Sequence, residues 1–202
     1  MIPCNYSKIV KESNSVFENS LEDNVRIYEY VKAANPKLNP IPVRSLDSSN
    51  LVETNIYDFD LRNDMNIKYS ATSPNLLASF IKINENDEIN LDRKVSSQLF
   101  FIIKGSGKSN IKSKGIINYY QGDMLVTSNE MVSFRANSDT TIYWVSDYPL
   151  MRYLNVIPQN SNFNSLLIRS EKMLSSINEI LKDTDNNEKN RLGILLGNKS
   201  TD

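Results

Sequence analysis

From about residue 50 to residue 147 the chain consists of short apolar runs separated by turn-forming residues. This pattern constrains the fold more than any other feature. The runs are rich in Ile, Val, Phe and Tyr, and clusters of Gly, Asn, Ser and Asp lie between them. Several short strands with a turn every ten residues or so are typical of all-β sandwiches and barrels. The runs are LVETNIYDFDL, NLLASFIKI, QLFFIIK, SNIKSKGIINYY, DMLVT, MVSFRAN and TTIYWVSD.

Two glycine-containing turns support this assignment. Gly105-Ser106-Gly107 directly follows the run LFFIIK, and it supplies the positive-φ freedom that a tight reversal between strands needs. Gly122-Asp123 follows an aromatic strand end and directs the chain into the run MLV. The sequence therefore predicts a β-domain over residues 46–157.

The segment before this domain is predicted to be a helical arm with a proline-rich connector, residues 1–45. A helix over residues 20–34 begins at Ser20, whose side chain can cap it, and ends at Asn35-Pro36. It ends there because the residue before a proline avoids the α region.

The segment after the domain, residues 158–202, is predicted to be a loop, a helix and a polar tail. The helix is SEKMLSSINEILKD, with Ser170 as its cap and an apolar stripe on one face. That stripe must be covered by the barrel or by a neighbouring molecule.

The chain contains no histidine, and this absence limits its chemistry. Histidine is the usual general base near neutral pH and the commonest ligand for zinc, iron, copper and nickel. Ser-His and Cys-His nucleophile arrangements are excluded. Carboxylates, Lys and Tyr remain as possible catalytic groups, but we assign no catalytic residue and expect a protein that is not an enzyme on its own.

The charges and the single cysteine narrow the partners and the compartment. The 23 Lys and Arg residues nearly balance 24 Asp and Glu, so a nucleic-acid partner is not expected. Cys4 is the only cysteine, which excludes an intrachain disulfide. The first residues lack the apolar core of a secretory signal, and no apolar stretch is long enough for a membrane span. We therefore expect a cytoplasmic protein without a membrane partner.

The middle of the chain resembles the cupin superfamily, whose fold is a double-stranded β-helix or jelly roll. Gln98 falls at the position of the family's glutamate, and Gly105, Gly122-Asp123 and Asn137 match the scaffold residues. The positions of the family's three histidine ligands also carry other residues in this chain. The histidine pair falls at about Asp92 and Lys94 or on nearby residues, and the third histidine falls at Ser133.

A narrower resemblance points to the N-terminal half of two-barrel, gentisate 1,2-dioxygenase-like cupin proteins. It covers residues 27–36 and the stretches SPNLLASFIKI, SSQLFFIIKGSG, QGDML, IYWVSDYPLMRYLNV and NRLGILLGN. In that class a histidine-bearing barrel carries out the iron chemistry. The resemblance therefore implies a split or shortened member, or one half of a longer protein.

Because every histidine of the metal-binding set is replaced, we expect neither a metal nor another cofactor. Imidazole nitrogens hold a metal such as zinc at about 2.0–2.1 Å, and serine and glutamine side chains cannot replace that set.

The candidate ligand-binding residues are those that the resemblance places inside the barrel: Gln98, Ser96, Phe100, Ser133 and Arg135. Strand alternation puts Gln98 and Phe100 on one face. Gln98 is either a ligand-recognising amide or a buried polar residue with protein partners. Arg135 either binds an anionic ligand or pairs with an acidic residue of the chain.

Three functional hypotheses follow. The first is a metal-free cupin domain with a structural or assembly role, which forms a homodimer. The second is a binding module for a small organic acid or an aromatic carboxylate. The third is a catalyst that uses carboxylates or Tyr, or a dioxygenase-like enzyme that a separate chain completes.

Overall fold

The computed structural model describes residues 25, 27, 30, 40–161, 163–182, 194–197 and 199. The chain divides into two compact units, Met1–Pro40 and Ile41–Asp202, and all of the strands described below belong to the second. The helix predicted over residues 20–34 lies almost entirely outside the described residues.

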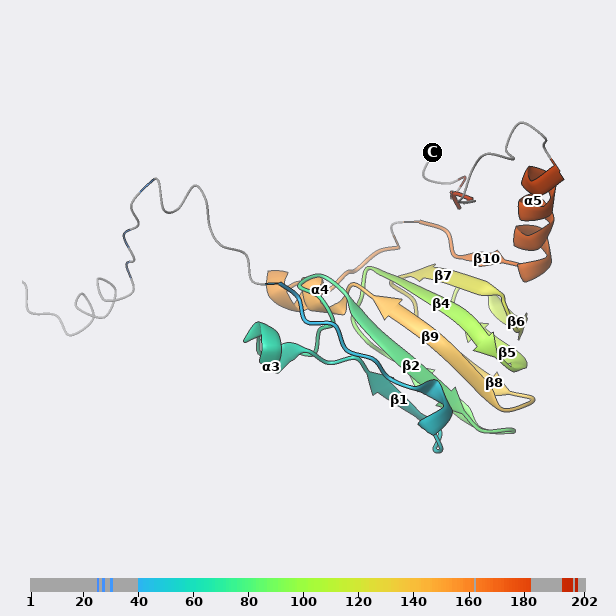
Figure 1. Cartoon of the computed structure of the whole chain (residues 1–202), viewed down its shortest axis with the longest axis horizontal. Coiled ribbons are helices and arrows are strands. Elements are labelled where there is room, and N and C mark those ends of the chain that lie inside the picture. The colour runs from blue at the N-terminus through green and yellow to red at the C-terminus, as the bar shows by residue number, and fades with distance from the viewer. Residues whose placement is uncertain are drawn as a thin grey trace, which may run out of the picture. The chain divides into compact units, whose positions relative to one another are not determined.

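The second unit is mostly β-structure, with short helices near its ends (Figure 1). Its elements are η2 (Ser48–Asn50), β1 (Asn55–Asp58), α3 (Arg62–Met65), β2 (Leu77–Ile83), β3 (Glu88–Leu91), β4 (Ser97–Lys104), β5 (Ser106–Ile111), β6 (Gly115–Tyr120), β7 (Met124–Ser128), β8 (Val132–Ala136), β9 (Thr140–Ser146), α4 (Tyr148–Leu154), β10 (Leu166–Ile168) and α5 (Ser170–Lys182).

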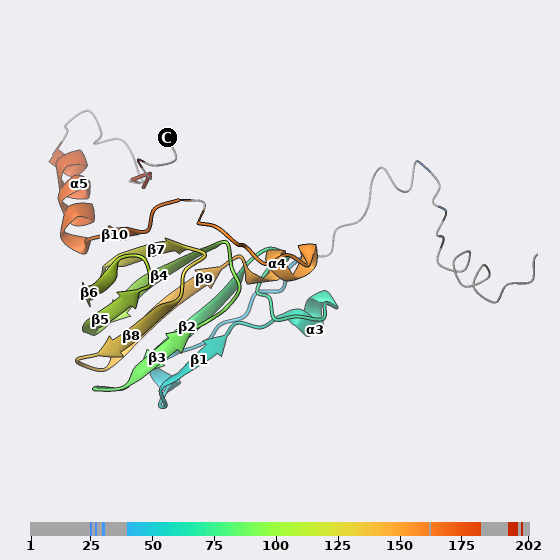
Figure 2. The same ribbon diagram turned by 180° about the vertical axis from the view of Figure 1, so that it is seen from behind.

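The strands form two antiparallel sheets that lie face to face (Figures 1 and 2). One sheet has six strands in the order β1-β2-β9-β4-β7-β10, and the other has four in the order β3-β8-β5-β6. Most neighbours are far apart in sequence, as β2 with β9 and β3 with β8 show, whereas β1 with β2 and β5 with β6 are consecutive strands. The predicted all-β class is therefore confirmed for the described residues.

The core between the sheets is filled by aromatic and aliphatic side chains from both of them. The Phe100 ring stacks on Trp144 with centroids 5.7 Å apart and contacts Phe134 at 5.0 Å. Tyr119 meets Phe134 edge-on at 5.6 Å. Offset stacked and edge-to-face rings of this kind are favourable arrangements, so they fix the middle of the interior as a packed layer.

Strand β4 shows the predicted alternation. Gln98, Phe100 and Ile102 are buried, whereas Leu99 and Phe101 are half-buried on the opposite face. The period of two residues is the reason that every second side chain enters the core.

The glycines of the β4–β5 turn have two different roles. Gly105 has a φ of +97°, which is the left-handed conformation expected for the turn. Gly107 does not, and the expectation that it too supplies positive φ is wrong. A Cβ at Gly107 would lie 2.1 Å from the Arg135 carbonyl oxygen and 2.5 Å from the Tyr119 hydroxyl. Gly107 is therefore needed for close packing.

Helix α5 confirms the predicted C-terminal helix, but another residue caps it. Ser170 is its first residue, and the Ser170 amide donates to Asp123 Oδ1 at 3.0 Å. Asp123 Oδ2 accepts from Arg169 Nη1 at 2.6 Å and from the Tyr120 amide at 3.1 Å. The Gly-Asp turn thus anchors the helix N-terminus, where a carboxylate is favoured. Among the described residues, no helix has the length and apolar character needed to cross a membrane.

Candidate functional site

Gln98 lies at the inner face of β4, is only 4% exposed, and uses both ends of its amide within the protein. Its Nε2 donates to the Glu130 carbonyl oxygen at 3.1 Å, and its Oε1 accepts from Trp144 Nε1 at 3.1 Å. Buried polar groups are normally paired in this way. The amide therefore links β4 to β9 and to the segment after β7.

Two hydroxyls flank Gln98 in neighbouring strands. Gln98 is paired in register with Ser146 of β9 on one side and Thr127 of β7 on the other. Side chains opposite each other in an antiparallel pair share a face, so the three form a polar row at one end of the interior. The Ser146 and Thr127 hydroxyls are buried and, within the part of the chain that the structure describes, have no hydrogen-bond partner. Ordered water commonly binds such groups.

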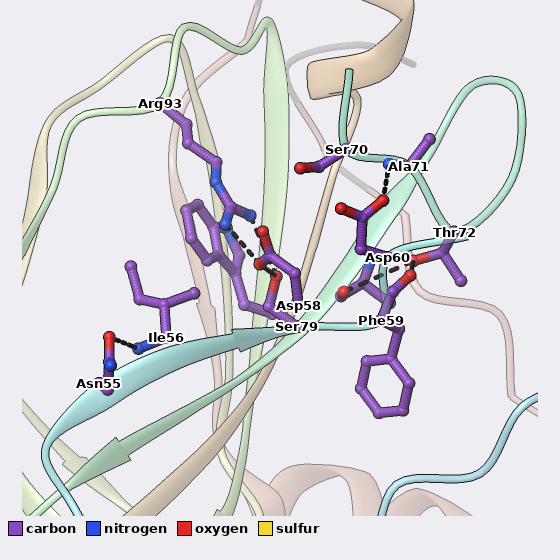
Figure 3. A network of polar contacts seen from close by, with 12 residues as sticks. Asn55, Ile56, Asp58, Phe59, Asp60, Ser70, Ala71, Thr72, Ser79 and Arg93 are labelled. Carbon is purple, nitrogen blue, oxygen red and sulfur yellow. Dashed lines mark hydrogen bonds and ion pairs between the residues drawn. The ribbon is translucent and has the colours of Figure 1, made fainter. Parts of the chain in front are cut away.

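Arg93, near this end of the interior, binds Asp58 and Ser79 (Figure 3). Its Nη2 donates to Asp58 Oδ1 at 2.5 Å, and its Nη1 donates to Ser79 Oγ at 3.0 Å. The guanidinium carbon lies 4.1 Å from the Trp144 ring centroid and 5.9 Å from that of Tyr148. One cation thereby connects β1, β2, β9 and α4.

A second set of polar contacts holds the loop beside Asp58 (Figure 3). Asp60 Oδ1 accepts from the backbone amides of Arg62 at 3.0 Å and Ala71 at 3.3 Å. Asp60 Oδ2 accepts from Arg62 Nε at 2.5 Å, and Arg62 also donates to Ser70 Oγ. Burial raises the pKa of Asp60, but the hydrogen bonds from Arg62 and Ala71 outweigh it and lower the pKa below its ordinary value. The ionised Asp60 thus fixes the chain that leads into β2.

Two of the predicted ligand-binding residues are oriented away from the interior. Ser133 and Arg135 alternate with the buried residues of β8, so they lie on the outer face of the sheet, and Arg135 is exposed. The expectation that they point inward is wrong because it places the strand one residue out of register. A shift of one residue exchanges the two faces of a strand.

The other predicted residues lie near Gln98 but differ in surroundings. Phe100 is fully buried in the aromatic layer. Ser96 is half-buried and directed to Asp147, which accepts from the Ser96 amide at 2.9 Å and from its hydroxyl. Gln98 and Ser96 therefore lie at one end of β4, Phe100 belongs to the packed core, and the ligand-binding role stays a prediction.

A cavity of about 290 Å³ opens outside the polar row. Three cationic side chains, Arg93, Lys94 and Lys112, line it together with Asp92 and Glu130. This volume is just below that of typical small-molecule sites, which span roughly 300–1,000 Å³.

Glu130, which lines this cavity, accepts hydrogen bonds from two other segments of the chain. Its Oε2 accepts from the Ser113 amide at 3.1 Å and its Oε1 from the Ser165 hydroxyl at 2.5 Å. Burial raises the pKa of Glu130, but the hydrogen bonds from Ser113 and Ser165 outweigh this effect and lower the pKa below its ordinary value. Glu130 is therefore an ionised anchor for the loops around it.

The side chains at this end do not fit a transition-metal ion. Across residues 40–161 and the other described positions, no group of three or more His, Cys, Asp or Glu side chains is placed to hold a metal. The oxygen of Gln98 already accepts the indole N–H, and Ser133 faces outward. Neutral amide and hydroxyl groups are weak donors for zinc or iron, which imidazole and thiolate ligands bind.

Arg93, Asp58 and Ser79 are the site residues that the sequence reasoning missed. The resemblance places the family's histidine pair at about Asp92 and Lys94, but both of these side chains are exposed and Arg93 between them turns inward. An arginine between two polar residues, just before a strand, is a weak signal, and Asp58 is 35 residues away along the chain.

Comparisons with known proteins give partial matches to solved structures and none elsewhere. Searches of protein-family models and of curated proteins found no match. The gentisate adduct of salicylate 1,2-dioxygenase from Pseudoaminobacter salicylatoxidans is 19% identical, with a TM-score of 0.44 over 58% of this chain and 30% of that one. A cupin 2 conserved barrel domain protein from Leptotrichia buccalis is 16% identical, with a TM-score of 0.38 over 56% and 50%.

The matches differ in length from this chain. It spans 30% of the dioxygenase structure and 50% of the Leptotrichia protein.

Proposed function

We propose that this chain is a cupin jelly roll with a structural and assembly role, that it carries no metal and that it acts in the cytoplasm as a homodimer. We further propose that it corresponds to the ligand-free barrel of a gentisate 1,2-dioxygenase-like protein. The hydrogen bonding of Gln98 is the observation that supports this proposal most directly. Both ends of its amide are bound by protein groups, so it is held as a structural residue.

The exposed apolar stripe of α5 supports the assembly role. Leu174 and Leu181 are 58% and 56% exposed, and no residue of α5 is buried. The helix is nevertheless fixed at its start by Asp123, so the stripe is presented in a defined orientation. Exposed apolar surface of this kind is typical of protein–protein contacts.

Multi-angle light scattering at micromolar concentration tests the assembly role. We expect a dimer for the chain and a shift toward monomer for Leu174→Glu/Leu181→Glu, with Glu179→Lys, at an exposed position on the opposite face of the same helix, as the control. A stable monomer for the unaltered chain would contradict the proposal.

The cavity beside Arg93 favours a second candidate, the binding of a small organic acid. Arg93, Lys94 and Lys112 supply three cationic groups against the carboxylates of Asp92 and Glu130. Because Asp58 is paired with Arg93, Lys94 and Lys112 are the groups that would attract an anion. A thermal-shift screen with aliphatic and aromatic carboxylates tests this candidate. It predicts stabilisation that Lys94→Ala/Lys112→Ala abolishes, and no stabilisation by any carboxylate would rule against it.

A further inference from the structure

Arg93 lies at the end of the interior where Gln98 binds the Trp144 indole. Its guanidinium carbon is 4.1 Å from the Trp144 ring centroid, and the Nε1 atom of the same ring donates to Gln98 at 3.1 Å. Gln98 is the residue at the position of the family's glutamate. Arg93 and Gln98 therefore contact the same indole, so a positive charge that belongs to the protein is already present there.

The charge of Arg93 is matched by a carboxylate in a sheltered place. Asp58 accepts from Arg93 at 2.5 Å, and the two side chains are only 26% and 16% exposed. Ser79, which is fully buried, donates to the same Asp58 oxygen at 2.6 Å and accepts from Arg93 at 3.0 Å. Removing one member of such a pair leaves the charge of the other buried without a partner, which lowers the stability of the fold.

The contacts also use the shape of the guanidinium. Its planar fork donates to two different oxygens while its face lies over Trp144. Lysine has neither the fork nor the flat face, so its ammonium cannot reproduce both contacts. The site is therefore built for a guanidinium in particular.

We infer that Arg93 is a fixed internal cation of the barrel. Its guanidinium lies on the Trp144 ring, whose N–H is bound by Gln98, and through Asp58 it holds strand β1 at this end of the interior. This inference does not depend on the assembly role, because it concerns contacts within one chain.

Chemical rescue of Arg93→Ala tests the inference, with Trp144 as the reporter because it is the only tryptophan in the chain. We expect red-shifted Trp144 emission, stronger acrylamide quenching and a Tm lowered by about 6–12 °C. Millimolar methylguanidinium should reverse these changes, whereas sodium chloride at the same concentration should not. Arg152→Ala, at an exposed position in α4, is the matched control and should leave the emission unchanged.

Two results would overturn the inference. One is unchanged emission and Tm in Arg93→Ala. The other is recovery of the signal with Zn²⁺, Mn²⁺ or Fe²⁺ but not with methylguanidinium.

If Arg93→Ala does not fold, a double-mutant cycle of Arg93→Lys and Asp58→Asn replaces it. We expect the losses in Tm of the two single variants to be clearly non-additive in the double variant, because the two residues act as one pair. Additive losses would count against the clamp.

Discussion

Replacing Gln98 by leucine removes the two hydrogen bonds that define this end of the barrel without a large change in volume. The variant leaves the Trp144 Nε1 and the Glu130 carbonyl oxygen without the partners they have at 3.1 Å. Each buried group that loses its partner costs about 1–3 kcal/mol. The extra apolar surface of leucine returns about 1 kcal/mol.

The expected net loss for Gln98→Leu is therefore about 1–5 kcal/mol, which lowers Tm by about 2–20 °C for a domain of this size. Urea unfolding followed by Trp144 fluorescence measures it directly. Gln121→Leu, at an exposed position, is the control and should change stability by less than about 0.5 kcal/mol.

A companion variant, Gln98→Glu, separates the two hydrogen bonds. An ionised carboxylate can still accept from Trp144, but it repels the Glu130 carbonyl oxygen to which Gln98 donates. A protonated carboxyl can donate to it. Stability of this variant should therefore fall relative to the unaltered chain as pH rises, and recover toward acidic pH. The reasoning is refuted if Gln98→Leu is as stable as the unaltered chain, because the amide would then not be bound as described.

Two further predictions concern the turn and the loop anchors. Gly107→Ala should strongly destabilise the fold, because the added Cβ would lie 2.1 Å from a backbone oxygen. The Cβ of Gly115→Ala would meet no atom within 4 Å, so this variant should lose only about 1 kcal/mol of stability, for its positive φ. Thermal unfolding of the two variants compares these losses. The lowered pKa of Glu130 gives stability that is present above its ordinary value of 4.5 and is lost as pH falls through the lowered pKa. Glu130→Gln should therefore flatten the pH dependence of the unfolding free energy on the acidic side.

Each of these predictions has a contradicting result. Equal stability of the two glycine variants would show that the close approach at Gly107 is not tight. An unchanged acid slope in Glu130→Gln would show that the bonds from Ser113 and Ser165 do not favour the ionised carboxylate.

Sequence patterns predict most of the strands, because alternation along a strand shows which of its side chains are buried, but they miss β3 (Glu88–Leu91) and β10 (Leu166–Ile168). In β4, for example, a period of two residues and a following glycine specify which side chains enter the core. The short helix α4 is not predicted, since Tyr148–Leu154 is too short to show a helical period, and its Pro149 is equally typical of a turn.

The site is harder to predict, because its contacts are long-range and depend on register. Arg93 and Asp58 are 35 residues apart, and no local pattern links them. The expected inward direction of Ser133 and Arg135 is wrong, because a one-residue shift in β8 exchanges its inner and outer faces. The expected inward direction of Gln98 is confirmed, since it lies in a strand with a full alternating pattern.

Metal analysis of the chain purified without chelators tests the central claim most directly. The claim is that this end of the barrel is filled by Arg93, Trp144 and Gln98 and has no ligand set for a transition metal. Mass spectrometry of acid-digested protein should then find iron, zinc and manganese far below one atom per chain, before and after incubation with each metal and desalting. One atom per chain, retained on desalting and lost in Gln98→Leu, would contradict it.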